Sequence, residues 1–302
     1  MSAAPPNALA RALRGFFSEH LPGVRGLSPH TVLSYRDALA LFLRFLATHR
    51  DRPVINLDLD DLDPDGVIAF LGHLERDRGN CAATRNTRLA ALHAFVRYLA
   101  AHAPEHLATC QRLLAVPFKR APVRPVEYLE GEEFHAMLAA ADRRTPEGRR
   151  DYALLLTFLN TGARVQELLD LRPADLQLER PLQVRLRGKG RKERLCPLWP
   201  RTAEALRALV AESRLGEGSL ERLFRNRRGE PLTRFGVRYL LRTYAQRAQT
   251  SVPSLARKRV HPHMMRHTAA VHLLQSGVDL VSISHWLAQL PSTVLATRAS
   301  SR

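Results

Sequence analysis

The chain has 302 residues, of which 45% are hydrophobic and 25% charged, which excludes a mainly disordered, collagen-like or low-complexity protein and favours two domains over one. Its 46 lysines and arginines outnumber its 29 aspartates and glutamates by 17, and this excess indicates a polyanionic partner, above all nucleic acid. Only four of the basic residues are lysines, so the arginine bias can equally reflect codon composition.

No segment of the sequence suits a membrane or a secreted protein. The longest apolar runs, 38–46 and 153–158, are short or interrupted by Arg44, so none could cross a bilayer. The N-terminus lacks the basic-then-apolar order of a secretory signal, and the three cysteines show no metal-binding spacing. We expect a cytoplasmic, nucleoid-associated protein with no membrane contact, no metal and no cofactor.

Residues 1–114 predict a small helical bundle. Apolar residues recur at helical spacing from Leu39 to Leu46, and Ser28 followed by Pro29 supplies an N-cap and a first-turn proline. Helical patterns recur in four further segments, 9–17, 67–74, 89–99 and 107–114. The next segment, 115–127, is proline-rich and basic, which disfavours a helix. It suits an extended linker that lies along phosphates with Lys119 and Arg120, and an ordinary solvated linker is the alternative.

From residue 128 onwards a second, mainly helical domain is expected. Helical patterns cover 130–141, 147–160, 165–171, 201–213, 233–249, 263–276 and 280–287. Between them, alternating apolar and polar residues predict one β-hairpin, in which 182–186 returns through 193–198. The predicted fold class is therefore mainly α, with a small β-hairpin or sheet in the C-terminal domain.

Two motifs of this domain combine basic residues with glycines. In TGARVQELLDL, 161–171, Gly162 interrupts an apolar helix, and Arg164 and Glu167 begin the next helix three residues apart on one face. A carboxylate there can orient the guanidinium; a solvated ion pair is the alternative. The hairpin tip RGKGRKER, 187–194, could carry Lys189 into a groove to deliver a proton. An exposed basic turn is the simpler interpretation.

A third motif, HPHMMRHTAAVHLL, begins at His261. It places His263 and Arg266 three residues apart on one helical face, with His267 one step round. His263 and His267 also have the i, i+4 spacing of a zinc site, but no acidic residue lies between them and no Cys or Glu ligand is near. We therefore expect no metal here; histidines packed in the core are the alternative.

Taken in order, the arginine, the lysine hairpin and the His-x-x-Arg motif resemble the tyrosine recombinase, or phage integrase, family. SPHTVLSYRDALALFLRFLA, 28–47, is similar to the opening helix pair of the family's core-binding domain, and LLQSGVDLVSISHWL, 273–287, to the stretch before its last active-site segment. The resemblance covers nearly the whole chain. It implies a two-domain, C-shaped clamp on double-stranded DNA: a SAM-like core-binding domain (1–114), a linker (115–127) and a catalytic-type domain (128–302).

The resemblance also implies roles for individual residues. Arg164 and Arg266 take the roles of the paired arginines, Lys189 that of the hairpin lysine and His263 that of the first histidine, while Glu167 supports Arg164. Two guanidiniums can bind the non-bridging oxygens of a phosphorane without a metal, a histidine can take the proton of the nucleophile and a lysine can give one to the 5′ oxygen. The family's tyrosine then holds the strand in a 3′-phosphotyrosine link. Further DNA contacts are expected from Arg187, Arg191 and Lys192.

After about residue 287 the sequence departs from the family pattern. The family continues with Leu-Gly-His and, about nine residues later, the tyrosine. Here Leu287 is followed by Ala288 and Gln289, Arg298 stands at the place of the tyrosine, and no tyrosine follows Tyr244. The tail has no helical period and is typical of an out-of-frame or replaced end.

We therefore expect a recombinase-like chain that binds DNA but does not cut it, and whose self-association on DNA is weakened by the altered tail. A non-catalytic protein that occupies recombination sites is the alternative of another class. An enzyme similar to type IB topoisomerases is a third hypothesis, and it needs the same tyrosine. Tyr152, Tyr239 and Tyr244 lie on helical patterns and are expected to be packing residues.

Overall fold

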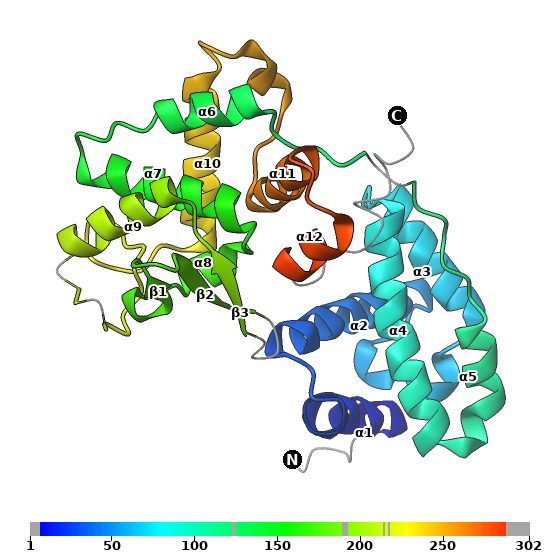
Figure 1. The fold of residues 1–302 in the computed structure, drawn as a ribbon. Coiled ribbons are helices and arrows are strands. Elements are labelled where there is room, and N and C mark those ends of the chain that lie inside the picture. Colours follow the sequence, from blue (N-terminus) through cyan, green and yellow to red (C-terminus); the bar gives the residue numbers. More distant parts are fainter. Residues whose placement is uncertain (1–6, 123–124, 189–192, 214, 217, 288–302) are drawn as a thin grey trace. The chain divides into compact units, whose positions relative to one another are not determined.

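The computed structural model describes residues 7–122, 125–188, 193–213, 215–216 and 218–287. The chain divides into two compact units, 1–123 and 124–302 (Figure 1). Each unit has its own hydrophobic core. Within the described ranges, no helix is long and apolar enough to cross a membrane.

The N-terminal unit is entirely helical in its regular elements. Its helices are α1 (Ala8–Gly15), a π-helical segment (Phe16–Val24), α2 (Pro29–His49), α3 (Pro64–Arg76), α4 (Ala82–His102) and α5 (Leu107–Leu114), with single 3₁₀ turns at 54–56, 59–61 and 104–106. As expected, Ser28 caps α2 by accepting a hydrogen bond from the Thr31 amide, and a proline follows it at the first helical position.

The helix predicted over 9–17 continues further than its pattern indicates. After α1 the chain keeps winding to Val24 as a π-helix that includes Pro22. Phe16 and Leu21 are both buried, and they lie five residues apart, which is the spacing that a π-helical turn places on one face. Packing of these two side chains therefore explains a winding that local propensity does not favour.

The C-terminal unit surrounds one long buried helix. Its helices are α6 (Gly131–Ala139), α7 (Pro146–Thr161), α8 (Val165–Leu169), α9 (Pro200–Glu212), α10 (Arg234–Ala248), α11 (Pro262–Gln275) and α12 (Leu280–Leu287). Twelve of the sixteen residues of α7 are buried, as expected for a helix covered on all sides. α7 packs against α9 and α11 (Figure 1), so its C-terminal end lies at the centre of the unit.

The sheet has three strands rather than the predicted hairpin alone. β1 (Leu176–Gln177), β2 (Gln183–Arg187) and β3 (Glu193–Pro197) form an antiparallel sheet in the order β1-β2-β3. The register pairs Val184 with Cys196 and Leu186 with Arg194. The prediction missed β1 because two residues are too few to show an alternating pattern.

Candidate active site

The candidate site forms where α7 ends and α8 begins. Gly162 ends α7 in the left-handed conformation, with φ +55°, and a Cβ at this position would lie 2.2 Å from Cδ2 of Leu287. Glycine is therefore required both by the backbone and by the space. The turn places Arg164 at the N-cap of α8, so a sharp reversal of the main chain positions this side chain.

Glu167 holds two guanidiniums. Its Oε1 accepts a hydrogen bond of 2.9 Å from Nη1 of Arg164, and its Oε2 accepts one of 2.8 Å from Nη2 of Arg194 on β3. The Glu167 side chain is only 2% exposed, whereas that of Arg164 is 40% exposed. Burial by itself raises the pKa of Glu167, but the hydrogen bonds and charges of Arg194 and Arg164 outweigh it and keep this pKa below its usual value. The Glu167 carboxylate thus stays ionised and holds the Arg164 guanidinium, while part of the Arg164 side chain remains exposed to solvent.

Arg266, on α11, is the most deeply buried charge of the site. It is 2% exposed, and its Nη1 donates to the carbonyl oxygen of Gly162 at 2.6 Å while Nη2 donates to the carbonyl of Leu287, at the end of α12. Burial, and then the nearby charge of Arg164, lower its pKa to about 10, so the guanidinium remains charged at neutral pH. In the described part of the chain, no carboxylate forms an ion pair with it.

These side chains face a pocket of about 470 Å³. The residues lining the pocket are Arg164, Val165, Arg238, His261, Pro262, His263 and Arg266. Three guanidiniums and two imidazoles therefore surround it, and none of its lining residues is acidic. Such a pocket suits an anion that can accept several hydrogen bonds, as the oxygens of a phosphate do.

The histidines of the site are neutral at neutral pH. Partial burial and the charges of Arg266 and Arg164 lower the pKa of His263, which leaves this exposed imidazole able to accept a proton. Its ring meets that of His267 edge to face, with centroids 4.5 Å apart. Burial, followed by the charges of His263 and His261, lowers the pKa of His267 to about 4.

The described residues do not gather a metal site. His261 accepts the amide hydrogen bond of Met264 as the N-cap of α11, and Nε2 of His272 lies 2.9 Å from the carbonyl oxygen of Leu129. Two of the four histidines of this motif therefore use a ring nitrogen in a hydrogen bond with the main chain. No group of three His, Cys, Asp or Glu side chains in the described ranges could hold a metal ion.

The predicted site residues fall into three groups. Arg164, His263 and Arg266 meet at one pocket, with Glu167 behind Arg164. Lys119 and Arg187 are held by carboxylates, Lys119 by Glu75 at 2.8 Å and Arg187 by Asp175 and Glu193, while Arg120 is exposed. Lys189, Arg191, Lys192, Ala288, Gln289 and Arg298 lie outside the described residues.

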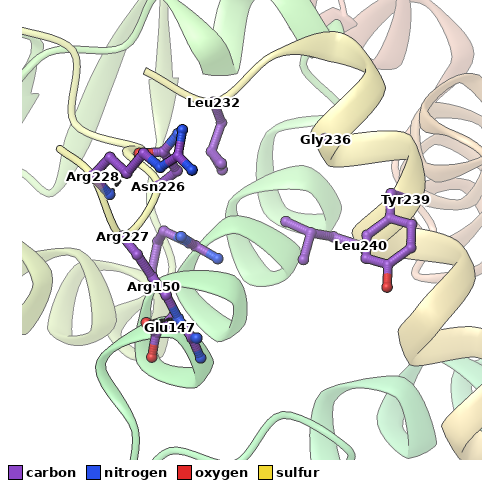
Figure 2. A pocket seen from close by; sticks show the side chains of 9 residues that line it. All are labelled: Glu147, Arg150, Asn226, Arg227, Arg228, Leu232, Gly236, Tyr239 and Leu240. Carbon is purple, nitrogen blue, oxygen red and sulfur yellow. Dashed lines mark hydrogen bonds and ion pairs between the residues drawn. The ribbon is translucent and has the colours of Figure 1, made fainter. Parts of the chain in front are cut away.

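The expectation that Tyr239 is a packing residue is wrong. Tyr239 is 69% exposed, and Figure 2 shows it on α10 at a separate pocket that Glu147 and Arg150 also line. Tyr152 and Tyr244 are buried as expected, and the Tyr244 hydroxyl donates to Oδ2 of Asp151 at 2.8 Å. Burial and the charge of Asp151 raise the pKa of Tyr244, so this hydroxyl is a poor nucleophile.

Sequence reasoning missed two residues of the site, Arg194 and Arg238. Arg194 pairs with the buried Leu186 across β2 and β3, so both side chains lie on the inward face of the sheet. A charged residue at an inward position of an alternating strand was the sequence signal that could have identified it. Arg238 lies one residue beyond the buried Val237 on α10. Its sequence carries no local signal, because its place at the pocket depends on the packing of α10 against α11 and α8.

Comparisons with known proteins agree with the geometry. Residues 127–288 match the model of the phage integrase family, and residues 16–103 match that of the phage integrase N-terminal SAM-like domain. A Sinorhizobium fredii protein named as an integrase/recombinase, y4rC, is 42% identical over 93% of this chain and 84% of its own length. Tyrosine recombinase XerC of Pelotomaculum thermopropionicum is 33% identical over 94% of this chain and 92% of its own.

Solved structures show the same fold at lower identity. The XerH site-specific recombinase, in a post-cleavage complex with a palindromic difH substrate, aligns with a TM-score of 0.71 and 23% identity over 91% of this chain and 77% of its own. A lambda integrase dimer bound to a COC′ core site aligns with a TM-score of 0.68 and 17% identity over 94% and 95% of the two chains. The mainly α fold class with a small sheet is thereby confirmed.

Proposed function

This chain belongs to the phage integrase family, the tyrosine recombinases, and from that premise we propose that it binds recombination sites in double-stranded DNA through its phosphate pocket but does not cut them. Membership of the family supports site-specific DNA recombination as the function. The parts that we propose are the absence of cleavage, the residue roles, the contact of the N-terminal unit with DNA and the weakened self-association.

One observation carries the proposal: a buried cation whose partners are neutral. Arg266 is 2% exposed, yet within the described residues both of its hydrogen bonds go to carbonyl oxygens. A buried charge without a counter-ion is costly, and the pocket that Arg266 lines contains no carboxylate. An anion in the pocket would supply the missing charge, so the arrangement favours a bound phosphate group.

The other residues of the pocket fit the same substrate. Arg164, fixed by Glu167, offers a second guanidinium to the non-bridging oxygens of a phosphodiester. Because these donors are held in place before the substrate arrives, they would stabilise the extra negative charge of a phosphorane without reorganisation. His263, whose pKa is lowered, would accept the proton of an attacking hydroxyl.

The chain lacks a tyrosine in the place where the family pattern requires one. None of its six tyrosines follows Tyr244, and the buried Tyr244 hydroxyl is engaged by Asp151. Without a nucleophile, the pocket can bind the phosphate and stabilise its charge but cannot form a covalent link. We propose that the N-terminal unit contacts the same duplex as a core-binding domain, and that the altered tail weakens self-association on DNA.

A nicked-duplex assay tests both halves of this proposal. The purified chain is mixed with a pool of nicked duplexes of random sequence, bound duplexes are recovered, and SDS-resistant adducts are counted. A chimera in which a family-like segment with Gly-His and a tyrosine replaces residues 288–302 is assayed on the recovered duplexes. We expect binding without adduct from the natural chain, and an adduct from the chimera.

Each other outcome has a defined meaning. If neither protein bound duplex DNA, the whole proposal would be wrong. An adduct from the natural chain would contradict the missing nucleophile, and the Tyr239→Phe and Tyr244→Phe variants would locate a relocated one. If the chimera bound DNA but formed no adduct, the alternative of a non-catalytic protein that occupies recombination sites would be favoured.

A further inference from the structure

A second basic pocket lies beside the candidate active site in the C-terminal unit. It has a volume of about 490 Å³ and is lined by Arg242, Ala245, Gln246, Gln249, Ala256, Arg257, Lys258, Arg259 and Val260. Four of these residues are cationic and none is acidic. The pocket therefore matches the active-site pocket in charge, although none of its residues belongs to the motifs that define the site.

The arginines of this pocket have no counter-ions in the described part of the chain. Arg242, Arg257 and Arg259 are exposed and form no hydrogen bond or ion pair with any described residue. Lys258 differs, because Glu133 holds its ammonium group at 2.6 Å. Three guanidiniums thus keep their charge and all their donors available to a ligand.

Several other arginines of the same unit pair with carboxylates. Around the pocket drawn in Figure 2, Arg227 pairs with Glu147, and Arg150 pairs with Asp151 at 2.7 Å. Close by, Arg144 pairs with Asp142 at 2.9 Å. On this surface Arg228 and Arg247 have no ion pair with a described residue, but carboxylates line its pockets, whereas no acidic residue lines the second basic pocket.

The second basic pocket continues the active-site pocket along α10. Arg238 lines the active-site pocket and Arg242 lines the second one, and these residues lie four apart on one helical face, about 6 Å along the axis. Val260 lines the second pocket and the next residue, His261, lines the active-site pocket, so the two pockets adjoin at this point of the chain. A DNA strand presents a phosphate about every 3.4 Å of helix axis.

We propose that the pocket lined by Arg242, Arg257 and Arg259 binds a backbone phosphate of the DNA strand that flanks the reacting phosphate. The spacing along α10 matches that of phosphates one or two nucleotides apart, and Gln246 and Gln249 add neutral donors for the same oxygens. This subsite rests on the proposed function. It would fix the strand on one side of the active site without reading its bases.

The test compares two triple variants with the same change in charge. Arg242→Gln/Arg257→Gln/Arg259→Gln removes the proposed subsite. The control, Arg144→Gln/Arg228→Gln/Arg247→Gln, removes three exposed arginines from the surface around Glu147 and Asp142. Binding of both to a fluorescein-labelled duplex of random sequence is measured by anisotropy over a series of salt concentrations.

We expect the subsite variant to bind at least tenfold more weakly at about 0.1 M salt. The slope of log affinity against log salt should fall by about 0.9, because one phosphate is no longer neutralised. The control should bind within about twofold of the natural chain. Equal losses of affinity in the two variants would overturn the subsite while leaving DNA binding intact. A natural chain that did not bind the duplex would instead refute the proposed function.

A pair of single variants guards against a folding defect. Arg242 and Arg247 are both exposed on α10, so Arg242→Gln and Arg247→Gln place the same substitution in the same helix. Thermal unfolding should be unchanged for both. A slope that is reduced for Arg242→Gln but not for Arg247→Gln would support the subsite, and equal slopes for the two variants would refute it.

Discussion

The two units of the chain bury very different material. Of the twelve polar or charged residues that are buried in the described ranges, ten lie in the C-terminal unit and only Asp61 and His93 in the N-terminal one. The N-terminal core is made of aliphatic and aromatic side chains, as in the contact of Phe42 with Phe70 at 5.3 Å between ring centroids. Hydrophobic packing alone can therefore hold that unit together.

Several buried polar groups of the C-terminal unit form hydrogen bonds around the candidate site. Asn160, near the end of α7, donates to the carbonyl oxygen of Pro197 and accepts from the amide of Trp199, so α7 fixes the exit of β3. Glu167 then joins Arg164 to Arg194. Buried polar groups cost free energy unless they are hydrogen-bonded, and here they place the guanidiniums accurately. The N-terminal unit is thus held by apolar packing, whereas the C-terminal unit also buries a polar network that positions the side chains of the site.

The largest loss of unfolding free energy is expected from removing the Glu167 carboxylate of the polar network. Glu167→Gln removes the carboxylate that two guanidiniums share, so Arg194 would remain buried without its partner. We expect the C-terminal unit to lose about 4 kcal/mol of unfolding free energy, measured by urea denaturation at pH 7. Arg185→Gln, on the outward face of β2, is the control. A loss below about 1 kcal/mol would mean that the network does not support the site.

A truncated core side chain in the N-terminal unit should lower the free energy of unfolding nearly as much, but independently of salt. Phe70 is fully buried and packs against Phe42 and Phe45, so Phe70→Ala should destabilise that unit by about 3 kcal/mol, because it removes apolar packing and leaves a cavity. Because no charge is involved, the destabilisation should be the same at low and high salt. A strongly salt-dependent destabilisation would contradict the contrast between the two units.

Acidification should weaken the C-terminal unit through His267. The pKa of His267 is about 4 in the folded chain, against 6.5 for an ordinary histidine. Below about pH 6.5 the unfolded chain therefore binds more protons than the folded one, so the free energy of unfolding decreases as the pH is lowered. From these values we expect a loss of about 2 kcal/mol between about pH 7 and about pH 5. His267→Phe should remove most of this loss in pH-dependent denaturation, whereas His135→Phe, at an exposed position, should not.

The smallest effect concerns a single buried hydrogen bond of α10 whose residues do not line the candidate site. Tyr244→Phe removes the donor to Asp151, which keeps its ion pair with Arg150. We expect a loss of about 1 kcal/mol in thermal or urea denaturation and unchanged DNA binding. Reduced DNA binding would show that this buried network communicates with the phosphate pocket.

Much of the fold could be predicted from local sequence. The periodic segments give helices close to their predicted bounds: 107–114 matches α5 at both ends, and the segment predicted from 280 begins where α12 begins. The errors have physical causes: β1 is too short to show a pattern, and the π-helical turn depends on the packing of Phe16 and Leu21. Tyr239 was misplaced because it shares an exposed stripe of α10 with Phe235, four residues earlier.

The sequence by itself determined the basic charge, the two-part organisation and the order of Arg164, the hairpin and the His-x-x-Arg motif, because composition, periodicity and spacing are local properties of a chain. Only the tertiary structure decided that Arg266 is buried against two carbonyl groups, that Arg194 shares Glu167, and that Arg238 reaches the same pocket. These facts depend on contacts between segments up to about a hundred residues apart. Burial and the partners of a charge set its chemistry, and both arise only when distant segments pack together.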